Sequence, residues 1–178
     1  MIDILILDVD GVLTDGRKYY DREGTVRFKT FCDRDWTAIK RFRALGIKVI
    51  FLTGDPFNVT IGENRNLDVF VNRQNGAHND KSSYLSEICA TYNVIPDNVA
   101  FVGDDIFDIG LMKKVRYKYC PANAPLEVRN LCTVLNKNSG DNVVAELFDF
   151  LLTTEGLPRY DFDEHLKNVY ELDLKEKF

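Results

Sequence analysis

The stretch IDILILDVDG, residues 2–11, decides the fold. Residues 2–7 are mostly β-branched and aliphatic, which is typical of a short buried strand. Asp8, Asp10 and Gly11 end the apolar run, and such residues are typical of the loop that follows a strand. The pattern predicts a buried strand with two carboxylates at its carboxyl end.

Similar apolar runs recur at residues 48–52, 69–71, 99–102 and 117–120. Segments with apolar residues three and four positions apart lie between these runs, and this spacing predicts helices. The segments are residues 36–45, 81–92, 106–114 and 142–152. Alternating strands and helices indicate an α/β fold, with a Rossmann-like parallel sheet covered by helices on both faces. Ligands bind beyond the carboxyl ends of the strands in such a sheet.

Two segments lie outside this alternation. Residues 17–31 read as a projecting β-hairpin, because strand-like runs flank a Gly-containing turn at residues 21–24. We therefore expect one domain over residues 1–157, with the hairpin as part of it. Residues 158–178 form a charged C-terminal tail, which could contain a short amphipathic helix around residues 164–172 and could pack on a neighbouring subunit.

The composition indicates one folded domain. A chain of 178 residues is near the usual size of a single domain, and 45% hydrophobic residues without a low-complexity stretch argue against extensive disorder. The net charge is −5, from 23 basic and 28 acidic residues, which argues against a nucleic-acid partner.

The same features predict a cytoplasmic location. Asp8 and Asp10 interrupt the first apolar run, so it is too short for a membrane span and unlike a signal peptide. The four cysteines show no CxxC spacing, and we expect them to be reduced. We expect neither a membrane nor a nucleic acid as a partner.

Carboxylates gather at the expected edge of the sheet. Asp8 and Asp10 follow the first strand, and Asp104 follows the strand at residues 99–102. Buried carboxylates carry a large desolvation cost, which a divalent cation would offset. Mg²⁺ prefers hard oxygen ligands, so a site made by Asp8, Asp10 and Asp104 is chemically sensible. Two acidic residues after a strand, taken alone, are equally well explained as a loop or a helix cap.

Four segments together resemble the ordered motifs of the haloacid dehalogenase superfamily. They are LDVDGVLTDG at residues 7–16, LTG at residues 52–54, Lys81, and GDDIFD at residues 103–108. The resemblance implies a phosphatase in which Asp8 attacks phosphorus and forms an aspartyl-phosphate. Asp10 would protonate the leaving alcohol, activate the water that follows, and hold Mg²⁺ through its backbone carbonyl.

The resemblance also assigns the remaining residues. Thr53 and Gly54 would bind the phosphoryl group, and Lys81 would neutralise it and restrain Asp8. Asp104 would complete the metal site. Two further carboxylates would support that site from behind through hydrogen bonds, namely those of Asp105 and Asp108.

The absence of room for a large cap domain indicates which branch of the superfamily the chain resembles. About forty residues separate the first motif from Thr53, which leaves no room for a large cap domain. With the hairpin and DGVLTDG at residues 10–16, the chain looks like the capless subgroup of 3-deoxy-D-manno-octulosonate 8-phosphate phosphatases and related nonulosonate phosphatases. The resemblance implies a homotetramer whose subunits cover each other's sites, and a phosphorylated sugar acid of surface-polysaccharide biosynthesis as substrate.

Two departures leave the substrate open. DRDWT at residues 33–37 replaces a glycine-containing run of the subgroup, and IGE at residues 61–63 stands where arginines are frequent. Such arginines would bind a sugar-acid carboxylate. Lys18, Arg65 and Arg73 could replace them, and Trp36 could line the pocket. The alternatives are a phosphatase for another sugar or nucleotide phosphate, or a catalytically weak oligomerisation or regulatory module of a cytidylyltransferase pathway.

Overall fold

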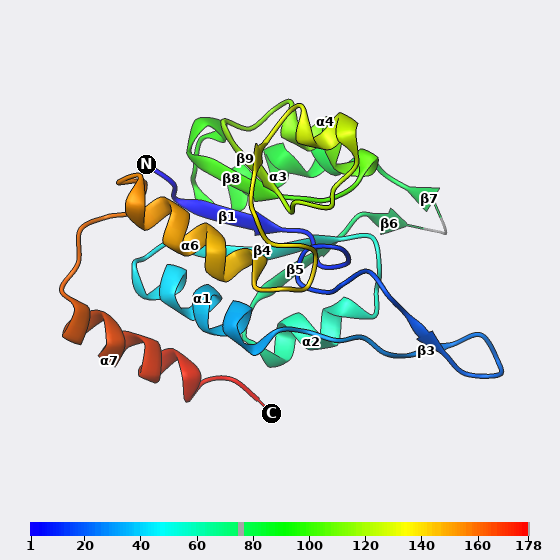
Figure 1. Cartoon of the computed structure of the whole chain (residues 1–178), viewed down its shortest axis with the longest axis horizontal. Coiled ribbons are helices and arrows are strands. Elements are labelled where there is room, and N and C mark those ends of the chain that lie inside the picture. Colours follow the sequence, from blue (N-terminus) through cyan, green and yellow to red (C-terminus); the bar gives the residue numbers. More distant parts are fainter. Residues whose placement is uncertain (75–76, 178) are drawn as a thin grey trace.

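A parallel β-sheet forms the centre of the protein. The computed structural model describes residues 1–74 and 77–177, and within them six strands pair in the order β10-β9-β8-β1-β4-β5 (Figure 1). All five pairings are parallel. The strands are β1 (Ile4–Leu7), β4 (Lys48–Thr53), β5 (Asp68–Val71), β8 (Val99–Val102), β9 (Tyr117–Cys120) and β10 (Thr133–Val134). The predicted α/β fold is confirmed.

The central strand β1 supplies both faces of the sheet with apolar side chains. Leu5 and Leu7 belong to one core cluster, and Ile4 and Ile6 belong to the other. Successive side chains of a strand point to opposite faces, so an uninterrupted apolar run suits a strand that is covered on both sides. β1 also pairs with β8 on one side and β4 on the other, so the chain order reverses at β1. A crevice forms at such a position in doubly wound folds.

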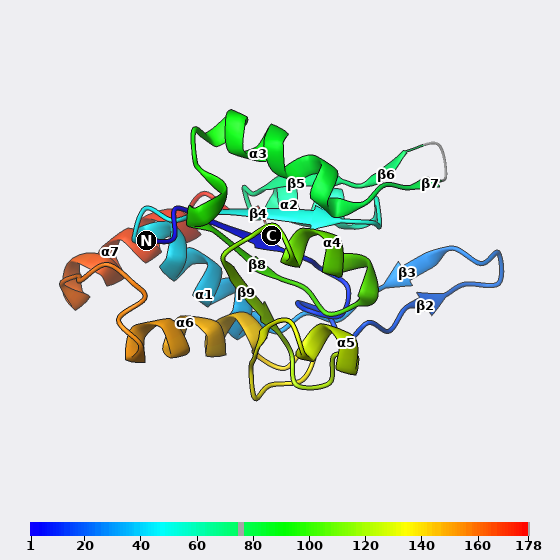
Figure 2. The ribbon, with the colours of Figure 1, turned by 90° about the horizontal axis from the view of Figure 1, so that it is seen from above.

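Helices cover both faces, as Figures 1 and 2 show. One face carries α1 (Asp33–Ala44), α2 (Asn58–Asn64) and α6 (Val143–Thr153). The other carries α3 (Leu85–Tyr92), α4 (Ile109–Met112) and α5 (Leu126–Arg129). Short 3₁₀ segments precede two helices of this second layer: η1 (Lys81–Tyr84) precedes α3, and η3 (Ile106–Asp108) precedes α4. A third 3₁₀ segment, η2 (Pro96–Asn98), precedes the strand β8. α1 and α6 are joined by Asp35, whose Oδ1 accepts hydrogen bonds from the amides of Val144 and Ala145 at 2.8 and 2.9 Å.

The predicted elements are present, with differences at their ends. The first strand begins at Ile4, and α1 begins three residues earlier than predicted. The predicted helix at residues 106–114 is divided into η3 and α4, and it ends at Met112. The pattern did not predict α5 or β10, which are four and two residues long, because a helical or strand period cannot be recognised over so few positions.

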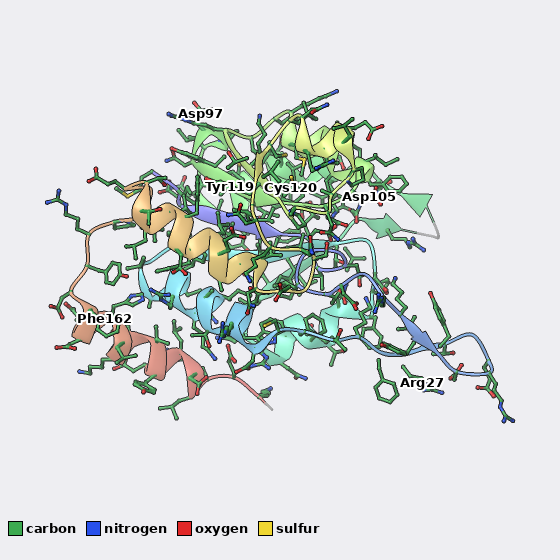
Figure 3. All side chains as sticks on the ribbon, viewed as in Figure 1. Arg27, Asp97, Asp105, Tyr119, Cys120 and Phe162 are labelled. Carbon is green, nitrogen blue, oxygen red and sulfur yellow. The ribbon has the colours of Figure 1, made fainter. Side chains whose placement is uncertain are left out.

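The predicted hairpin projects from the carboxyl edge of the sheet, beyond the ends of β1 and β4 (Figure 2). Its antiparallel strands are β2 (Tyr19–Tyr20) and β3 (Val26–Phe28), and the labelled Arg27 marks it in Figure 3. A second hairpin at the same end of the molecule, β6 (Arg73–Gln74) and β7 (Ala77–His78), was not predicted, and its turn lies outside the described residues (Figure 2). Between Asp10 and Thr53 the described chain holds only the first hairpin, α1 and β4, so no large cap is inserted there.

The C-terminal tail folds onto its own chain. It forms α7 (Phe162–Asp173), which lies beside α1. Lys40 of α1 reaches Asp173 at 2.6 Å and Glu176 at 3.4 Å, and Glu176 also pairs with Arg65 at 2.8 Å. The domain boundary at residue 157 and the contact of the tail with a neighbouring subunit stay predictions. In the described part of the chain, no helix has both the length and the apolar character needed to cross a membrane.

The substitution Lys40→Met should destabilise the protein by about 3 kcal/mol, because Glu176 is buried and would lose one of its two cationic partners. Urea unfolding monitored by circular dichroism measures the difference. Lys137→Met is the matched control, because the Lys137–Asp141 ion pair is exposed and should contribute less than about 1 kcal/mol. Equal stability of the two variants would contradict a structural role for the tail contact.

Candidate active site

A buried lysine joins the ends of two central strands. Asp8 follows β1, Lys81 opens η1, and Asp108 closes η3. The Nζ atom of Lys81 lies 2.7 Å from Asp8 Oδ2 and 2.7 Å from Asp108 Oδ1. All three residues are buried, so the ammonium group compensates carboxylates that are largely withdrawn from solvent. The predicted convergence of Asp8 and Lys81 is present.

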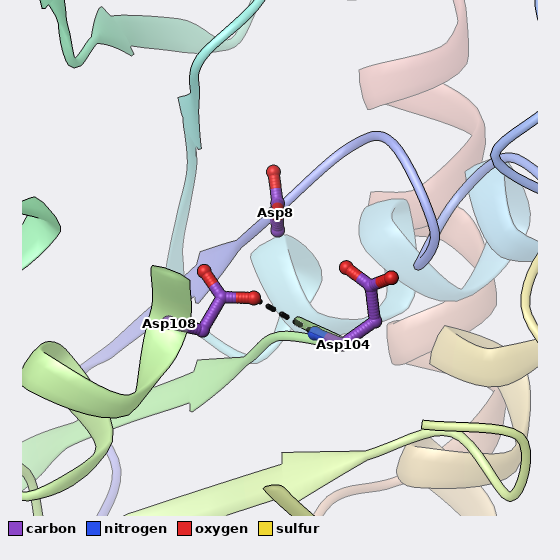
Figure 4. Close-up of side chains that lie close together, drawn as sticks. All are labelled: Asp8, Asp104 and Asp108. Carbon is purple, nitrogen blue, oxygen red and sulfur yellow. Dashed lines mark hydrogen bonds between the residues drawn. The ribbon is translucent and has the colours of Figure 1, made fainter. Parts of the chain in front are cut away.

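Asp108 also shapes the loop that follows β8. Its Oδ2 accepts hydrogen bonds from the amides of Asp104 and Asp105 at 2.8 and 3.1 Å, and Figure 4 shows the first of them. The exposed Asp105 caps η3, because its carboxylate accepts from the amide of Ile106. Asp108 therefore holds Lys81 and the Asp104 backbone together. The roles predicted for Asp105 and Asp108 in supporting a metal site stay predictions.

Gly11 lets the loop after β1 approach Asp104. Its φ is +87°, a conformation that L residues with a side chain adopt rarely. A Cβ at this position would lie 1.9 Å from Asp104 Oδ2, which is far inside van der Waals contact. Only glycine therefore allows the loop that carries Asp8 and Asp10 to lie against the loop that carries Asp104.

Three carboxylates are placed to hold a hard cation. Oxygen atoms of Asp8, Asp104 and Asp108 lie within 4.8 Å of one another (Figure 4). Asp104 Oδ1 is buried and has no hydrogen-bond partner among the described residues. Lys81 alone does not balance the three negative charges. An oxygen-binding divalent cation such as Mg²⁺ would satisfy Asp104 and offset this excess, so the donor set fits it.

Burial changes the protonation of these groups. Burial and the charges of Asp8 and Asp108 raise the pKa of Asp104 to about 8. Burial also raises the pKa of Asp8, against the opposing charge of Lys81. Burial acts to lower the pKa of Lys81, but Asp8 and Asp108 outweigh it and raise that pKa, so Lys81 stays charged. A proton and a cation therefore compete for the Asp104 carboxylate.

Thr53 is not among the residues that line the cavity at this edge of the sheet. It is the last residue of β4 and is fully buried. Its Oγ1 accepts hydrogen bonds from the amide of Asp55 at 3.2 Å and from Asn58 Nδ2 at 2.8 Å. Thr53 thus holds the loop that contains Gly54. Both hydrogen bonds use the hydroxyl oxygen as acceptor, so the hydroxyl group can still donate one hydrogen bond. Binding of a phosphoryl group by Thr53 and Gly54 stays a prediction.

The Asp10 carboxylate contacts residues of the hairpin and of α2. Lys29 Nζ lies 2.7 Å from its Oδ1, and Asn58 Nδ2 donates to its Oδ2 at 3.1 Å. Among the described residues, the metal-binding cluster is completed by Asp108 and does not include the Asp10 side chain. The predicted metal contact through the Asp10 carbonyl stays a prediction. Lys29 was missed, because a lysine on a hairpin strand reads as exposed.

These residues surround a cavity of about 330 Å³. Every predicted site residue except Thr53 lines it, namely Asp8, Asp10, Gly54, Lys81, Asp104, Asp105 and Asp108. Lys18 and Arg73 also line it and bring positive charge to its mouth. Arg65 and Trp36 do not line it: Arg65 stacks on the ring of Trp36, 4.6 Å from its centroid, and Trp36 belongs to the core. Of the three predicted cationic candidates, two reach the cavity.

The sequence of this chain is similar to those of known hydrolases. A family model described as haloacid dehalogenase-like hydrolase matches residues 75–148, which include Lys81 and Asp104. The 3-deoxy-D-manno-octulosonate 8-phosphate phosphatase of Escherichia coli K12 is 33% identical over 156 residues, covering 87% of this chain and 81% of that protein.

The fold of this chain is also similar to the folds of solved phosphatase structures. The cobalt-bound deoxy-D-mannose-octulosonate 8-phosphate phosphatase of Haemophilus influenzae superimposes with a TM-score of 0.78 and 29% identity, over 87% of this chain and 90% of that one. The 3-deoxy-D-manno-octulosonate 8-phosphate phosphatase of Yersinia pestis gives a TM-score of 0.76 and 29% identity, over 87% and 83% of the two chains.

Binding of Mg²⁺ should release protons. With its pKa raised to about 8, Asp104 is largely protonated at neutral pH, and a cation binds only the ionised carboxylate. The affinity should therefore rise with pH until Asp104 is ionised without the metal. Isothermal titration calorimetry at pH 7 in buffers of different ionisation enthalpy counts the protons. Asp105→Asn should keep the proton release, whereas Asp104→Asn should lose it together with most of the affinity. Binding without proton release by the wild-type protein would contradict this account.

Proposed function

We propose that this chain, which belongs to the 3-deoxy-D-manno-octulosonate 8-phosphate phosphatase family of haloacid dehalogenase-like hydrolases, removes phosphate from a phosphorylated sugar acid of that kind with Mg²⁺ as cofactor. The observation that carries the proposal is the bridge of Asp8, Lys81 and Asp108 beside Asp104. Asp8 lines the cavity there, and Lys81 keeps its carboxylate in place, as a nucleophile requires.

In the first half of the reaction, an oxygen of Asp8 forms a bond to phosphorus while the bond from phosphorus to the sugar oxygen breaks. The electron pair of that bond stays on the sugar oxygen, which takes a proton from Asp10. Lys81 neutralises charge on Asp8 and the phosphoryl group. Bound Mg²⁺, held by Asp8 and Asp104, would further neutralise the phosphoryl oxygens. The product is an aspartyl-phosphate on Asp8.

In the second half, Asp10 takes a proton from water, whose oxygen attacks phosphorus. The bond between phosphorus and Asp8 breaks, and its electron pair returns to the Asp8 carboxylate. Inorganic phosphate leaves. Asp10 thereby serves as acid and then as base, so each half returns it to the form that the other half needs. Its position on the cavity wall, two residues from Asp8, supports both assignments.

The acid group of the sugar would meet the positive side of the cavity. Lys18 and Arg73 line the wall, and the Lys18 side chain is 29% exposed. Charge-assisted hydrogen bonds from such groups to a carboxylate are about twice as strong as neutral ones. These two residues could thus replace the arginines that are absent at residues 61–63.

We also propose a homotetramer in the cytoplasm. Three aromatic side chains of the hairpin are exposed, Tyr19 at 53%, Tyr20 at 61% and Phe28 at 70%. An apolar surface on a projecting hairpin is suited to packing against another subunit. The four cysteines are free in the described structure, which is consistent with a reducing compartment.

The wild-type protein should release phosphate from 3-deoxy-D-manno-octulosonate 8-phosphate only with Mg²⁺, and faster than from hexose phosphates or nucleotides. Phosphate release with Mg²⁺ and with EDTA, across this panel, measures the preference. Asp8→Asn should fold and lose turnover by more than about 10⁴-fold, because an amide is not a nucleophile. Preference for another ester would refute the substrate, and turnover by Asp8→Asn would refute the mechanism. A wild-type protein inactive on every ester would point to the regulatory module.

Light scattering should give a mass about four times the 20.5 kDa of one chain. The double variant Tyr20→Asp, Phe28→Asp should shift the mass toward one chain, because it places charges on the exposed apolar side of the hairpin. Ile95→Asp is a matched control, since Ile95 is 59% exposed but lies outside both the hairpin and the C-terminal tail. If the wild-type protein has the mass of one chain, the proposed tetramer is wrong.

A further inference from the structure

Lys29 is a buried lysine that the catalytic scheme above does not use. It follows β3 at the base of the hairpin, and its side chain has 0% exposure. Lysine is almost never buried without partners, because its ammonium group loses its hydration. Here Nζ lies 2.7 and 2.9 Å from the two oxygens of Asp10, 2.9 Å from Asp55 Oδ2 and 2.9 Å from Asn58 Oδ1. These partners collect around the proposed acid and base.

Lys29 contacts both oxygens of the Asp10 carboxylate. Oδ2 accepts hydrogen bonds from Lys29 at 2.9 Å and from Asn58 at 3.1 Å, which come from the hairpin and from α2. Oδ1 is buried and accepts no aligned hydrogen bond from the described residues, although Lys29 Nζ lies 2.7 Å away in the ion pair. The ammonium group of Lys29 therefore holds the carboxylate from the hairpin side, in an orientation in which Asp10 lines the cavity.

Asp55 gives Lys29 a second counter-ion. It pairs with Lys29 at 2.9 Å and with Lys18 at 2.7 Å. Burial acts to raise the pKa of Asp55, but these two lysines outweigh it and hold the pKa below its usual range. Asp55 therefore stays negative. Lys29 keeps a charged partner whether Asp10 carries a proton or not, so the clamp can persist through both halves of the reaction.

We infer that Lys29 is a positioning residue that fixes the Asp10 carboxylate for proton transfer and thereby couples the hairpin to the chemistry. The inference rests on the proposed phosphatase function. Proton transfer requires the donor within hydrogen-bond reach of the leaving oxygen, so a carboxylate free to rotate would transfer its proton less often. Lys29 acts through Asp10 and does not touch phosphorus.

The leaving group tests this role. An alkyl phosphate such as the sugar-acid phosphate needs the proton of Asp10 when its bond to phosphorus breaks, whereas 4-nitrophenyl phosphate leaves as a stable anion and needs it little. The value of kcat/KM covers the steps up to this bond breaking. Lys29→Met should lower kcat/KM for the alkyl ester by about 10²-fold and for the aryl ester by less than about 5-fold, since general acid catalysis contributes about 10²–10⁴-fold. Lys29→Arg should recover part of the alkyl activity.

The controls separate positioning from folding. Arg27→Met changes an exposed cation two residues away whose ion-pair partner is Asp21, and it should leave both values nearly unchanged. An equal loss on both esters, or no loss, in Lys29→Met would overturn the inference. If circular dichroism shows that Lys29→Met does not fold, the loss of kcat/KM on the alkyl ester is compared with the loss on the aryl ester in Lys29→Arg and Lys29→Gln instead. A wild-type protein inactive on both esters would instead refute the proposed function.

Discussion

The contact of one ammonium group with two carboxylates organises the active edge of this protein. Lys81 lies 2.7 Å from both Asp8 and Asp108, and these residues come from three separate segments of the chain. Because the three residues are buried, the ammonium group compensates carboxylate charge that solvent screens poorly. The bridge therefore fixes the end of β1, the start of η1 and the loop after β8 in relation to one another. The cavity and the cation-binding carboxylates depend on that arrangement.

Sequence patterns predicted the strands, because a strand is recognised from residues that are adjacent in the sequence. The apolar run before Asp8 and the run at residues 99–102 give the strands directly, and parallel strands bring their carboxyl ends to one edge. Lys81 is different, because a lysine at the start of a helix is ordinary by itself. Only the resemblance to a known family selected it. The sequence also could not give the burial of Lys29, since its partner Asn58 lies 29 positions away.

The departures from the subgroup pattern have structural reasons where the structure describes them. At Gly62 a Cβ would lie 2.3 Å from Val69 Cγ2, so α2 packs closely on β5 and this position excludes an arginine. Asp35 joins α1 to α6 through two backbone amides, so it serves the core rather than a ligand. Arg65 holds Glu176, whose position 111 residues further along the chain could not be read from local sequence. Each case depends on a contact between residues that are not adjacent in the sequence.

The shared burial of Lys81 and its carboxylates also limits how this protein can drift during evolution. In an exposed site, a descendant could lose catalytic residues one at a time at no expense to its fold. Here the loss of Lys81 alone would strand two buried carboxylates, whereas the loss of Asp8 alone would leave Lys81 paired with Asp108. An inactive descendant should therefore keep Lys81 as long as both carboxylates remain, because selection on stability preserves the lysine even where selection on activity has ceased.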